Sequence, residues 1–353
     1  MVLDKKWIHE DFVDLSNISN REFPEIMTAA GHRIKPSSQT GKDFLFEIEI
    51  PDHRPDCNSM IGLAREVAAA FQLPMQHHEP MVLGDDTDSI YNWLDVDITA
   101  DELCNRYTAR MVSNIQIAPS PAWLCQRLLN SGITPVNNIV DISNYVMLEY
   151  GQPIHVFDYR HFSFGSMIIR EAAPGETLTA LDGTVHTLQS GMPVIANDWE
   201  PVSPAAITGF SNCEINGDTT AVVIGAGNFH TDTICNTALN FGIPSAASLA
   251  DIDPLMTVPA VQRACELVEF LKCGNVLDGI IDVLNYVPEP RTLEFQPSEI
   301  NRILGSNLSE EEIIGYLKRL EISVSNDRIS LPSFRSDLIN LSDIAGEIRR
   351  LQF

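Results

Sequence analysis

The sequence predicts a multi-domain protein of the α/β and α+β classes, with a central mixed α/β domain between two small α+β domains. Its 353 residues are enough for two or three domains with separate hydrophobic cores. Runs with the 3.6-residue period of helices alternate with runs typical of strands. Residues 76–88 combine charge, proline and glycine without a period, which is typical of a linker. We therefore expect an N-terminal domain over 1–75, a central domain over 89–286 and a winged-helix-like domain over 287–353.

The N-terminal domain shows two helical segments and one strand. Residues 21–30 have helical character, and residues 44–50 alternate apolar and acidic side chains, as a half-buried strand does. Asp56 or Asn58 is expected to cap a second helix that continues to Phe71. These elements together predict a small α+β unit.

Two helices and three strands stand out in the central domain. Ser120-Pro121 places a proline at the first position of one helix, and Thr257 opens another helix that Gly274 should close. The strand-like runs cover residues 166–170, 192–196 and 220–224. This mixture of elements predicts an α/β fold.

The C-terminal domain carries the clearest local signals. Ser309 and Glu312 form a capping box, and Leu308 with Ile313 forms the matching hydrophobic staple. Residues 322–331 are typical of a hairpin. The last helix has one apolar face, made of Leu341, Ile344, Ile348 and Leu351.

The net charge of −25 is the strongest physical constraint on the binding partners. Residues 89–288 carry 7 basic and 21 acidic side chains. Proteins bind nucleic acid mainly by neutralising phosphates with Lys and Arg. We therefore expect weak or no general binding of RNA by this chain.

Cysteines and histidines do not form a recognisable metal or disulfide pattern. The seven cysteines are widely spaced and lack a C-x-x-C pair, which favours reduced thiols in the cytoplasm. His77 and His78 with Asp85, Asp86 and Asp88 have no recognisable ligand spacing, so we expect a solvated linker rather than a metal site. No run approaches about 18 apolar residues, and the N-terminus lacks the apolar core of a secretory signal, so no membrane association is expected.

Residues 140–158 form the most informative run of the chain. They read V-D-I-S-N-Y-V-M-L-E-Y-G-Q-P-I-H-V-F-D. A turn at 151–153 sets Ser143 and Asn144 close to His155, as in one wall of a pocket. From these residues alone two further interpretations stay open: His155 is a hydrogen-bonded structural histidine, and the Ser143–Asn144 pair caps a turn.

This run closely resembles the signature of the editing domain of the bacterial phenylalanyl-tRNA synthetase β subunit. The similarity extends, in the family's order, over nearly the whole chain. Residues 7–34 and 46–71, the latter with G-L-A-R-E-V-A, are similar to the two halves of the family's N-terminal domain. Residues 106–121 are similar to the editing domain, and residues 290–353, with P-S-F-R-S-D-L, to the small domain that follows it.

The resemblance also implies that parts of the family's subunit are missing from this sequence. In the family, the two halves of the N-terminal domain flank an oligonucleotide-binding fold that contacts tRNA, whereas here they are joined across residues 37–42. The catalytic-like core and the anticodon-binding domain have no counterpart. We therefore expect a shortened relative, either a natural short paralogue or an excised fragment, that does not aminoacylate tRNA by itself.

A candidate site follows from the same resemblance. The family's editing pocket hydrolyses tyrosine wrongly attached to phenylalanine tRNA. The positions that match this pocket are Ser143, Asn144, His155, Gly209, Ser245 and Ala247. The family's glutamate at the end of a strand falls at Gly225, its second turn glycine at Phe210, and its R-x-E-R-G segment at 249–253. The carboxylate that could accept a hydrogen bond from a tyrosine hydroxyl is thus replaced, and we expect a changed or lost specificity.

A nucleotide site is the competing interpretation of one segment. Residues 221–227 read A-V-V-I-G-A-G, like the start of a dinucleotide-binding fingerprint, but the third glycine position is His230. An isolated G-x-G is a weak signal, and the sequence contains no P-loop. We expect no cofactor.

Three functional hypotheses follow. In the first, the central domain binds an aromatic amino acid or aminoacyl group as a regulatory or accessory module, without efficient hydrolysis. In the second, the chain is a free-standing editing hydrolase that acts on the 3′ end of mischarged tRNA. In the third, it is a structural partner within a synthetase-like complex.

Overall fold

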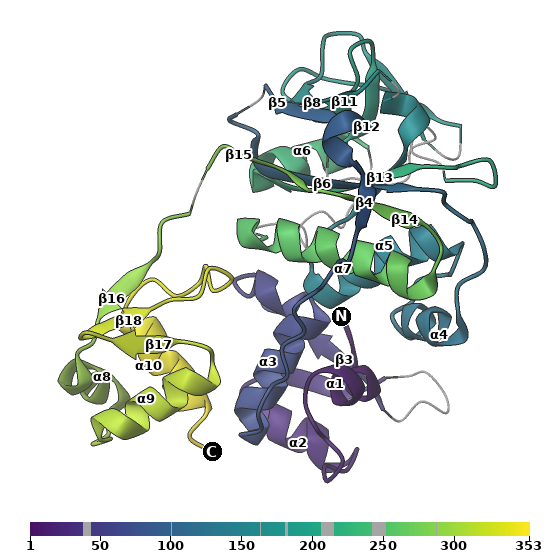
Figure 1. The fold of residues 1–353 in the computed structure, drawn as a ribbon. Coiled ribbons are helices and arrows are strands. Elements are labelled where there is room, and N and C mark those ends of the chain that lie inside the picture. The colour runs from purple at the N-terminus through teal and green to yellow at the C-terminus, as the bar shows by residue number, and fades with distance from the viewer. Residues whose placement is uncertain are drawn as a thin grey trace. The chain divides into compact units, whose positions relative to one another are not determined.

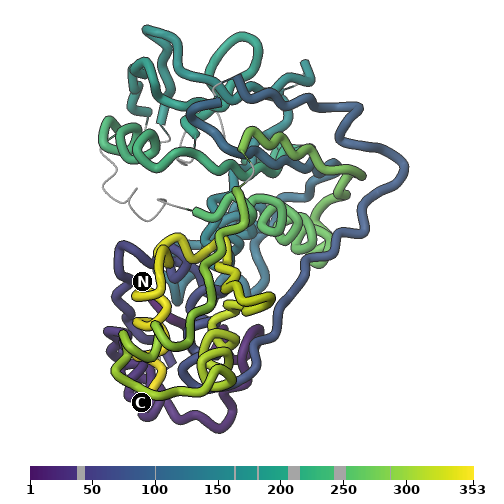
Figure 2. Tube along the Cα trace, turned by 90° about the vertical axis from the view of Figure 1, so that its left-hand side faces the viewer, coloured from purple at the N-terminus to yellow at the C-terminus, as the bar shows by residue number. Residues whose placement is uncertain are grey.

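A computed structural model of the chain describes residues 1–37, 44–99, 101–162, 164–180, 183–205, 215–241, 252–286 and 288–353 (Figure 1). The chain divides into two compact units. Met1–His78 and Pro288–Phe353 together form the terminal unit, and Glu79–Val287 forms the central unit. Both ends of the chain therefore belong to the terminal unit (Figure 2). The two small domains expected at opposite ends of the sequence thus share one compact unit.

The N-terminal part of the terminal unit is a three-stranded antiparallel sheet with three helices among its described residues. Its elements are β1 (Val2–Asp4), α1 (Lys5–Asp11), α2 (Glu22–Ala29), β2 (Arg33–Pro36), β3 (Leu45–Glu49), a 3₁₀ turn at Pro55–Cys57, and α3 (Met60–Phe71). The strand order is β1-β3-β2, so β2 and β3 are paired neighbours on either side of residues 37–44. The expected helix and strand of this region are both present.

The expected cap of α3 is wrong by one to three positions. Ser59 is the N-cap, and its hydroxyl oxygen accepts a hydrogen bond from the Gly62 N–H at 3.0 Å. Asp56 lies in the preceding 3₁₀ turn, where its carboxylate binds Arg54 instead, at 2.8 Å and 2.9 Å. Asp56 is thus held by Arg54, two positions earlier, which also bonds Glu66 of α3, and it does not take the capping role that its sequence position indicates.

The C-terminal part of the terminal unit has three strands and three helices among the described residues. Its elements are β16 (Thr292–Glu294), α8 (Pro297–Leu304), α9 (Glu310–Arg319), β17 (Ser323–Ser325), β18 (Arg328–Ser330) and α10 (Leu341–Arg350). The capping box of Ser309 and Glu312 is present at the start of α9. The hairpin of β17 and β18 turns through Asn326 and Asp327, whose positive φ values suit a tight two-residue turn.

A buried cluster of charges joins these two parts of the terminal unit. The Glu66 carboxylate on α3 lies 2.5 Å from an Arg54 guanidinium nitrogen and 2.7 Å from one of Arg350 on α10. Glu347 bonds Arg350 at 2.6 Å and Arg335 at 3.0 Å. Burial acts to raise the pKa of Glu66, but the positive charges of Arg350 and Arg54 outweigh it and hold that pKa well below its usual range.

The same cluster explains a group of atoms that resembles a metal site. Ligand atoms of Asp56, Cys57 and Glu66 lie within 4.8 Å of one another. The Arg54 guanidinium already bonds both carboxylates, so the protein supplies the positive charge itself. Burial raises the pKa of the Cys57 thiol well above its ordinary value, which opposes the thiolate that a metal would need. These residues therefore form part of an ion-pair cluster.

The central unit contains two sheets and a short two-stranded ribbon in its described part. The larger sheet has the order β4-β14-β6-β13-β7, with β15 also paired to β6, and the smaller has the order β12-β11-β8-β5. Its strands are β4 (Asp85–Ser89), β5 (Asp95–Ile98), β6 (Cys104–Ser113), β7 (His155–Asp158), β8 (Ser166–Glu171), β9 (Thr177–Thr179), β10 (Val185–Thr187), β11 (Pro193–Ala196), β12 (Pro201–Pro204), β13 (Val222–Phe229), β14 (Asn275–Asp278) and β15 (Ile281–Leu284). Its α-helices are α4 (Ala122–Asn130), α5 (Asn138–Tyr150), α6 (Thr231–Asn240) and α7 (Thr257–Leu271).

The layers of the central unit place a hydrophobic core between the two sheets. Helices α5 and α7 lie along one side of the larger sheet, and β5, β8 and β11 lie on its other side (Figure 1). Inward-facing residues of both sheets, such as Met111 on β6 and Ile169 on β8, are fully buried in one cluster. Because side chains alternate across a strand, Tyr107, Ala109 and Met111 of β6 share this inner face.

Two expected boundaries in the central unit are wrong. Pro121 is the N-cap of α4 rather than its first helical residue. Helix α7 ends before Gly274, because Lys272 takes the left-handed conformation (φ +54°) and the Cys273 N–H bonds back to the Val268 carbonyl. Gly274 instead packs against Val112 on β6, where a side chain would overlap.

The last part of the expected linker is bonded to the central unit. Residues Asp85–Ser89 form β4, which pairs in parallel with β14. Ahead of it, the backbone N–H groups of Leu83 and Gly84 donate to the Glu269 carboxylate on α7, at 3.0 Å and 2.8 Å. No helix in the described ranges is long and apolar enough to cross a membrane.

Candidate functional site

The run at 140–158 folds as helix α5, a turn and strand β7. Asn137 caps α5, and its side-chain oxygen accepts the N–H groups of Ile139 and Val140. Asp141 accepts hydrogen bonds from the Ser120 hydroxyl at 2.5 Å and the Val136 N–H at 2.8 Å. The helix ends at Gly151, whose φ of +74° is the left-handed conformation that glycine adopts without strain.

Ser143 and Asn144 lie in the middle of α5 and are partly exposed. The Ser143 hydroxyl donates to the Val140 carbonyl at 2.8 Å, so it bonds within its own helix. Neither residue caps a turn, which removes that interpretation. Among the hydrogen bonds between described residues, none joins Ser143 or Asn144 to His155.

The turn between α5 and β7 is tied to the sheet by a glutamine that the sequence did not single out. The buried Gln152 side-chain amide donates to the carbonyl oxygens of Pro153 and Gly227, both at 3.1 Å. Gly227 lies on β13, the neighbour of β7. The hydrogen bond to Gly227 attaches the turn before His155 to β13, the strand with which His155 is in register.

His155 is the first residue of β7 and is buried. Its register partner on β13 is Gly225, so the two positions share a face of the sheet. The Nε2 atom is buried and has no hydrogen-bond partner among the described residues, and the ring stacks on Phe157 with centroids 5.7 Å apart. Burial lowers the pKa of His155 to about 4, so the imidazole is neutral near pH 7.

The ring of Tyr107 packs directly against Gly225 and Gly227. A Cβ at Gly225 would overlap the Tyr107 hydroxyl oxygen and lie 3.0 Å from its Cζ. A Cβ at Gly227 would lie 3.1 Å from Tyr107 Cδ2 and overlap Phe229. Tyr107 itself is fully buried. The resemblance places the family's glutamate at Gly225, and no such side chain fits there while Tyr107 keeps this position.

The positions of the two glycines argue against a nucleotide site at residues 221–227. Both lie inside strand β13, which runs to Phe229, and α6 begins only at Thr231. A dinucleotide fingerprint needs its glycines in the turn between strand and helix, where backbone N–H groups reach the phosphates. The G-x-G of this chain serves close packing against aromatic rings instead.

Another part of the signature has a structural role. Glu149, near the end of α5, is buried and pairs with Arg263 of α7 at 2.8 Å. Arg263 also bonds Glu266 at 2.7 Å. This ion pair joins α5 to α7, so Glu149 stabilises the packing of the two helices and is not part of the candidate site.

Three predicted site residues lie outside the described residues: Gly209, Ser245 and Ala247. The same is true of Phe210 and of most of segment 249–253. The structure therefore locates Ser143, Asn144, His155 and Gly225, and it places only His155 and Gly225 side by side. The sequence did not predict Tyr107 and Gln152 as site residues, because the residues around them give no sign that they contact β13.

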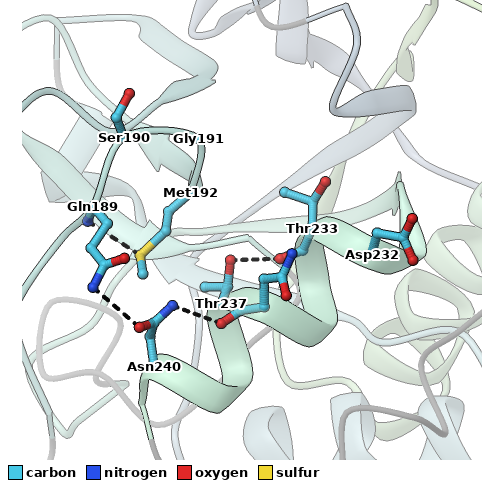
Figure 3. Close-up of a pocket in the computed structure, with 9 residues that line it drawn as sticks. Gln189, Ser190, Gly191, Met192, Asp232, Thr233, Thr237 and Asn240 are labelled. Atoms are coloured by element: carbon cyan, nitrogen blue, oxygen red, sulfur yellow. Dashed lines mark hydrogen bonds between the residues drawn. The ribbon is translucent and has the colours of Figure 1, made fainter.

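A separate polar pocket of about 380 Å³ lies between α6 and the turn before β11 (Figure 3). Its lining includes Gln189, whose amide donates to Asn240 at 3.2 Å, and Thr233 and Thr237 on α6. None of the predicted site residues that the structure describes lines it. The candidate site is therefore the His155–Gly225–Tyr107 face, and not this pocket.

Comparison with known families identifies both halves of this arrangement. Residues 103–273 match the B3/4 domain family, and residues 293–352 match the tRNA synthetase B5 domain family. An N-terminal fragment of the phenylalanyl-tRNA synthetase beta subunit from Pyrococcus horikoshii has a similar fold, with a TM-score of 0.52 over 99% of both chains and 15% identity. The chain thus combines domains of the kind found in tRNA synthetase subunits.

The similar full-length sequences specify the family. The phenylalanine–tRNA ligase beta subunits of Moorella thermoacetica and Clostridium tetani are 38% and 36% identical to this chain, over 88% and 87% of its length. The chain belongs to the phenylalanine–tRNA ligase beta subunit family. It spans about two fifths of the length of these relatives, since the aligned regions cover 39% and 40% of them. The family and the fold class expected from the sequence are confirmed.

Proposed function

We propose that this chain is an accessory binding protein of the phenylalanine–tRNA ligase beta subunit family. Its B3/4 domain would bind an aromatic amino acid, or the aminoacyl group at the 3′ end of a tRNA, without efficient hydrolysis. The observation that carries this proposal is Gly225, which lies under the Tyr107 ring where the resemblance places a glutamate. A cytoplasmic location is part of the proposal, as is a synthetase-like partner subunit.

The chemistry of the described side chains supports binding rather than hydrolysis. Hydrolysis of an ester needs a base that activates water, and such a base works best when its pKa is near the working pH. Burial lowers the pKa of His155 to about 4, which makes it a weak base at pH 7. The Ser143 hydroxyl already donates within its helix. A neutral buried imidazole is, however, well suited to one directed hydrogen bond with a ligand.

The charge of the chain favours a small ligand over a whole tRNA. The net charge of −25 repels a phosphate backbone. Only residues 37–44 separate β2 from β3, so no further domain is inserted between these strands. An editing hydrolase is the second candidate, and it would need a partner to deliver the tRNA.

A thermal-shift titration followed by a deacylation assay tests the proposal. We expect L-phenylalanine or L-tyrosine, but not L-leucine, to raise the melting temperature, since binding to the native state stabilises it. His155→Ala should abolish this shift, and the exposed His53→Ala in the terminal unit should keep it. The proposal is wrong if tyrosyl-tRNA is deacylated above the spontaneous rate and His155→Ala removes that activity. The absence of both effects would favour the structural-partner hypothesis.

A further inference from the structure

Tyr107 occupies the centre of the candidate site. Its side chain is fully buried on the inner face of β6, and its ring lies along Gly225 and Gly227 of β13. His155 is on the same face, in register with Gly225. The chain therefore places a phenol of its own on the same face of the sheet as a buried imidazole.

Two glycines at alternate positions of a buried strand require an explanation. Glycine weakens a strand interior, because it loses more backbone entropy on folding and has no side chain to pack. Here the reason is a close approach: Tyr107 Cζ and Cε1 would lie 3.0 Å and 3.2 Å from a Cβ at 225. The missing side chains thus leave a flat surface, the glycine bed (Gly225 and Gly227), which is covered by one aromatic ring.

We propose that Tyr107 determines the ligand specificity of this site by acting as an internal occupant of the glycine bed. An aromatic ligand reaches the bed and the Nε2 atom of His155 only when the Tyr107 ring rotates away. This inference rests on the function proposed above and adds to it a competition between the chain's own ring and the ligand ring. The free energy of displacing Tyr107 lowers the apparent affinity, as in any site whose competent conformation is a minor one.

The geometry itself is tested with variants at position 225. In Gly225→Ala the new methyl group overlaps the Tyr107 hydroxyl oxygen, so the variant should melt at a lower temperature than the wild type. In Gly225→Ala/Tyr107→Phe the overlapping oxygen is gone, and much of the lost melting temperature should return. Additive effects of the two substitutions would show that the phenol does not lie on Gly225, and would overturn the proposal.

The competition is tested by calorimetric titration with p-cresol and with L-tyrosine. Tyr107→Ala should bind p-cresol at least tenfold more tightly than the wild type, because the bed is then open. Tyr107→Phe keeps the ring and should bind like the wild type. Met111→Ala is the matched control, since it removes another fully buried side chain from the same face of β6.

The outcomes separate this inference from the proposed function. If Tyr107→Ala binds p-cresol and the wild type binds no aromatic amino acid, the internal occupant is supported and the proposed function fails. If both bind with equal affinity, the proposed function stands and Tyr107 does not compete. If Tyr107→Ala does not fold, Tyr107→Leu replaces it, and a gain of less than threefold there overturns the inference.

Discussion

Within the terminal unit a buried cluster of charges joins two parts of the chain, whereas within the central unit apolar packing joins two sheets. In the terminal unit, Glu66 pairs with Arg54 and Arg350 and is almost wholly buried. In the central unit, the corresponding interior is a cluster of apolar side chains between two sheets. Residues 66 and 350 are 284 positions apart in the sequence. In both units the joined segments lie far apart in the sequence, since β6 pairs with β13, β14 and β15. Charge pairs join α3 to α10 in the terminal unit, and apolar packing joins the two sheets of the central unit.

Buried ion pairs and apolar contacts differ in how strongly they depend on geometry and in the free energy that is lost when one partner is removed. A buried ion pair is strong only with good geometry, and removal of one partner leaves an unpaired charge in a medium of low polarity. Apolar contacts are tolerant of small shifts and depend mainly on volume. We therefore expect the terminal unit to respond sharply to the loss of one charge, and the central unit to respond to changes in volume and in the protonation of His155.

The largest expected effect is that of Glu66→Gln. The substitution keeps the shape of the side chain but removes the negative charge shared by Arg54 and Arg350, and it should cost about 3–5 kcal/mol of unfolding free energy. Hydrogen exchange should become faster in α3 and α10 and stay unchanged in β13. Glu321→Gln is the control, because its partner Arg65 is 3.1 Å away in a more exposed pair, and it should cost less than about 1 kcal/mol. Equal effects of the two variants would contradict the comparison.

The next effect is a pH dependence of the central unit. Burial lowers the pKa of His155 from 6.5 to about 4, so the unfolded chain binds this proton more readily than the folded one. The corresponding stability is present above about pH 6.5 and is lost as the pH falls towards 4, by about 3 kcal/mol in all. An NMR titration of the imidazole should give a midpoint near 4. In urea unfolding between pH 7.5 and pH 5, His155→Gln should lose about 2 kcal/mol less than the wild type. A midpoint near 6.5 would show that the ring is solvated.

The smallest effect concerns a local signal in the terminal unit. Ser309→Ala removes the hydroxyl that accepts the Glu312 N–H at the start of α9, and it should cost about 1 kcal/mol. Urea unfolding of the two chains measures this difference. A cost similar to that of Glu66→Gln would mean that α9 controls the terminal unit, and that the charge cluster is not its main support.

Local sequence signals predicted many elements correctly. The capping box of α9, the hairpin of β17 and β18 and the turn at Gly151 follow from side chains within a few positions of one another. The prediction failed at the cap of α3, where Arg54, two positions before Asp56, binds its carboxylate within a buried cluster that also holds Glu66. For the site, sequence comparison pointed to His155 and Gly225, and the structure places these two in register.

The sequence by itself determined the family, because the family's motifs depend only on residue identity and spacing, and it predicted that Gly225 stands where the family has a glutamate. Only the tertiary structure decided which side chain lies against Gly225. Tyr107 lies over Gly225 because β6 and β13 pair antiparallel in one register, and a shift of one residue would turn either side chain to the opposite face. Likewise, nothing local to Glu66 indicates Arg350 as its partner, since long-range charge pairs form only once both segments have folded.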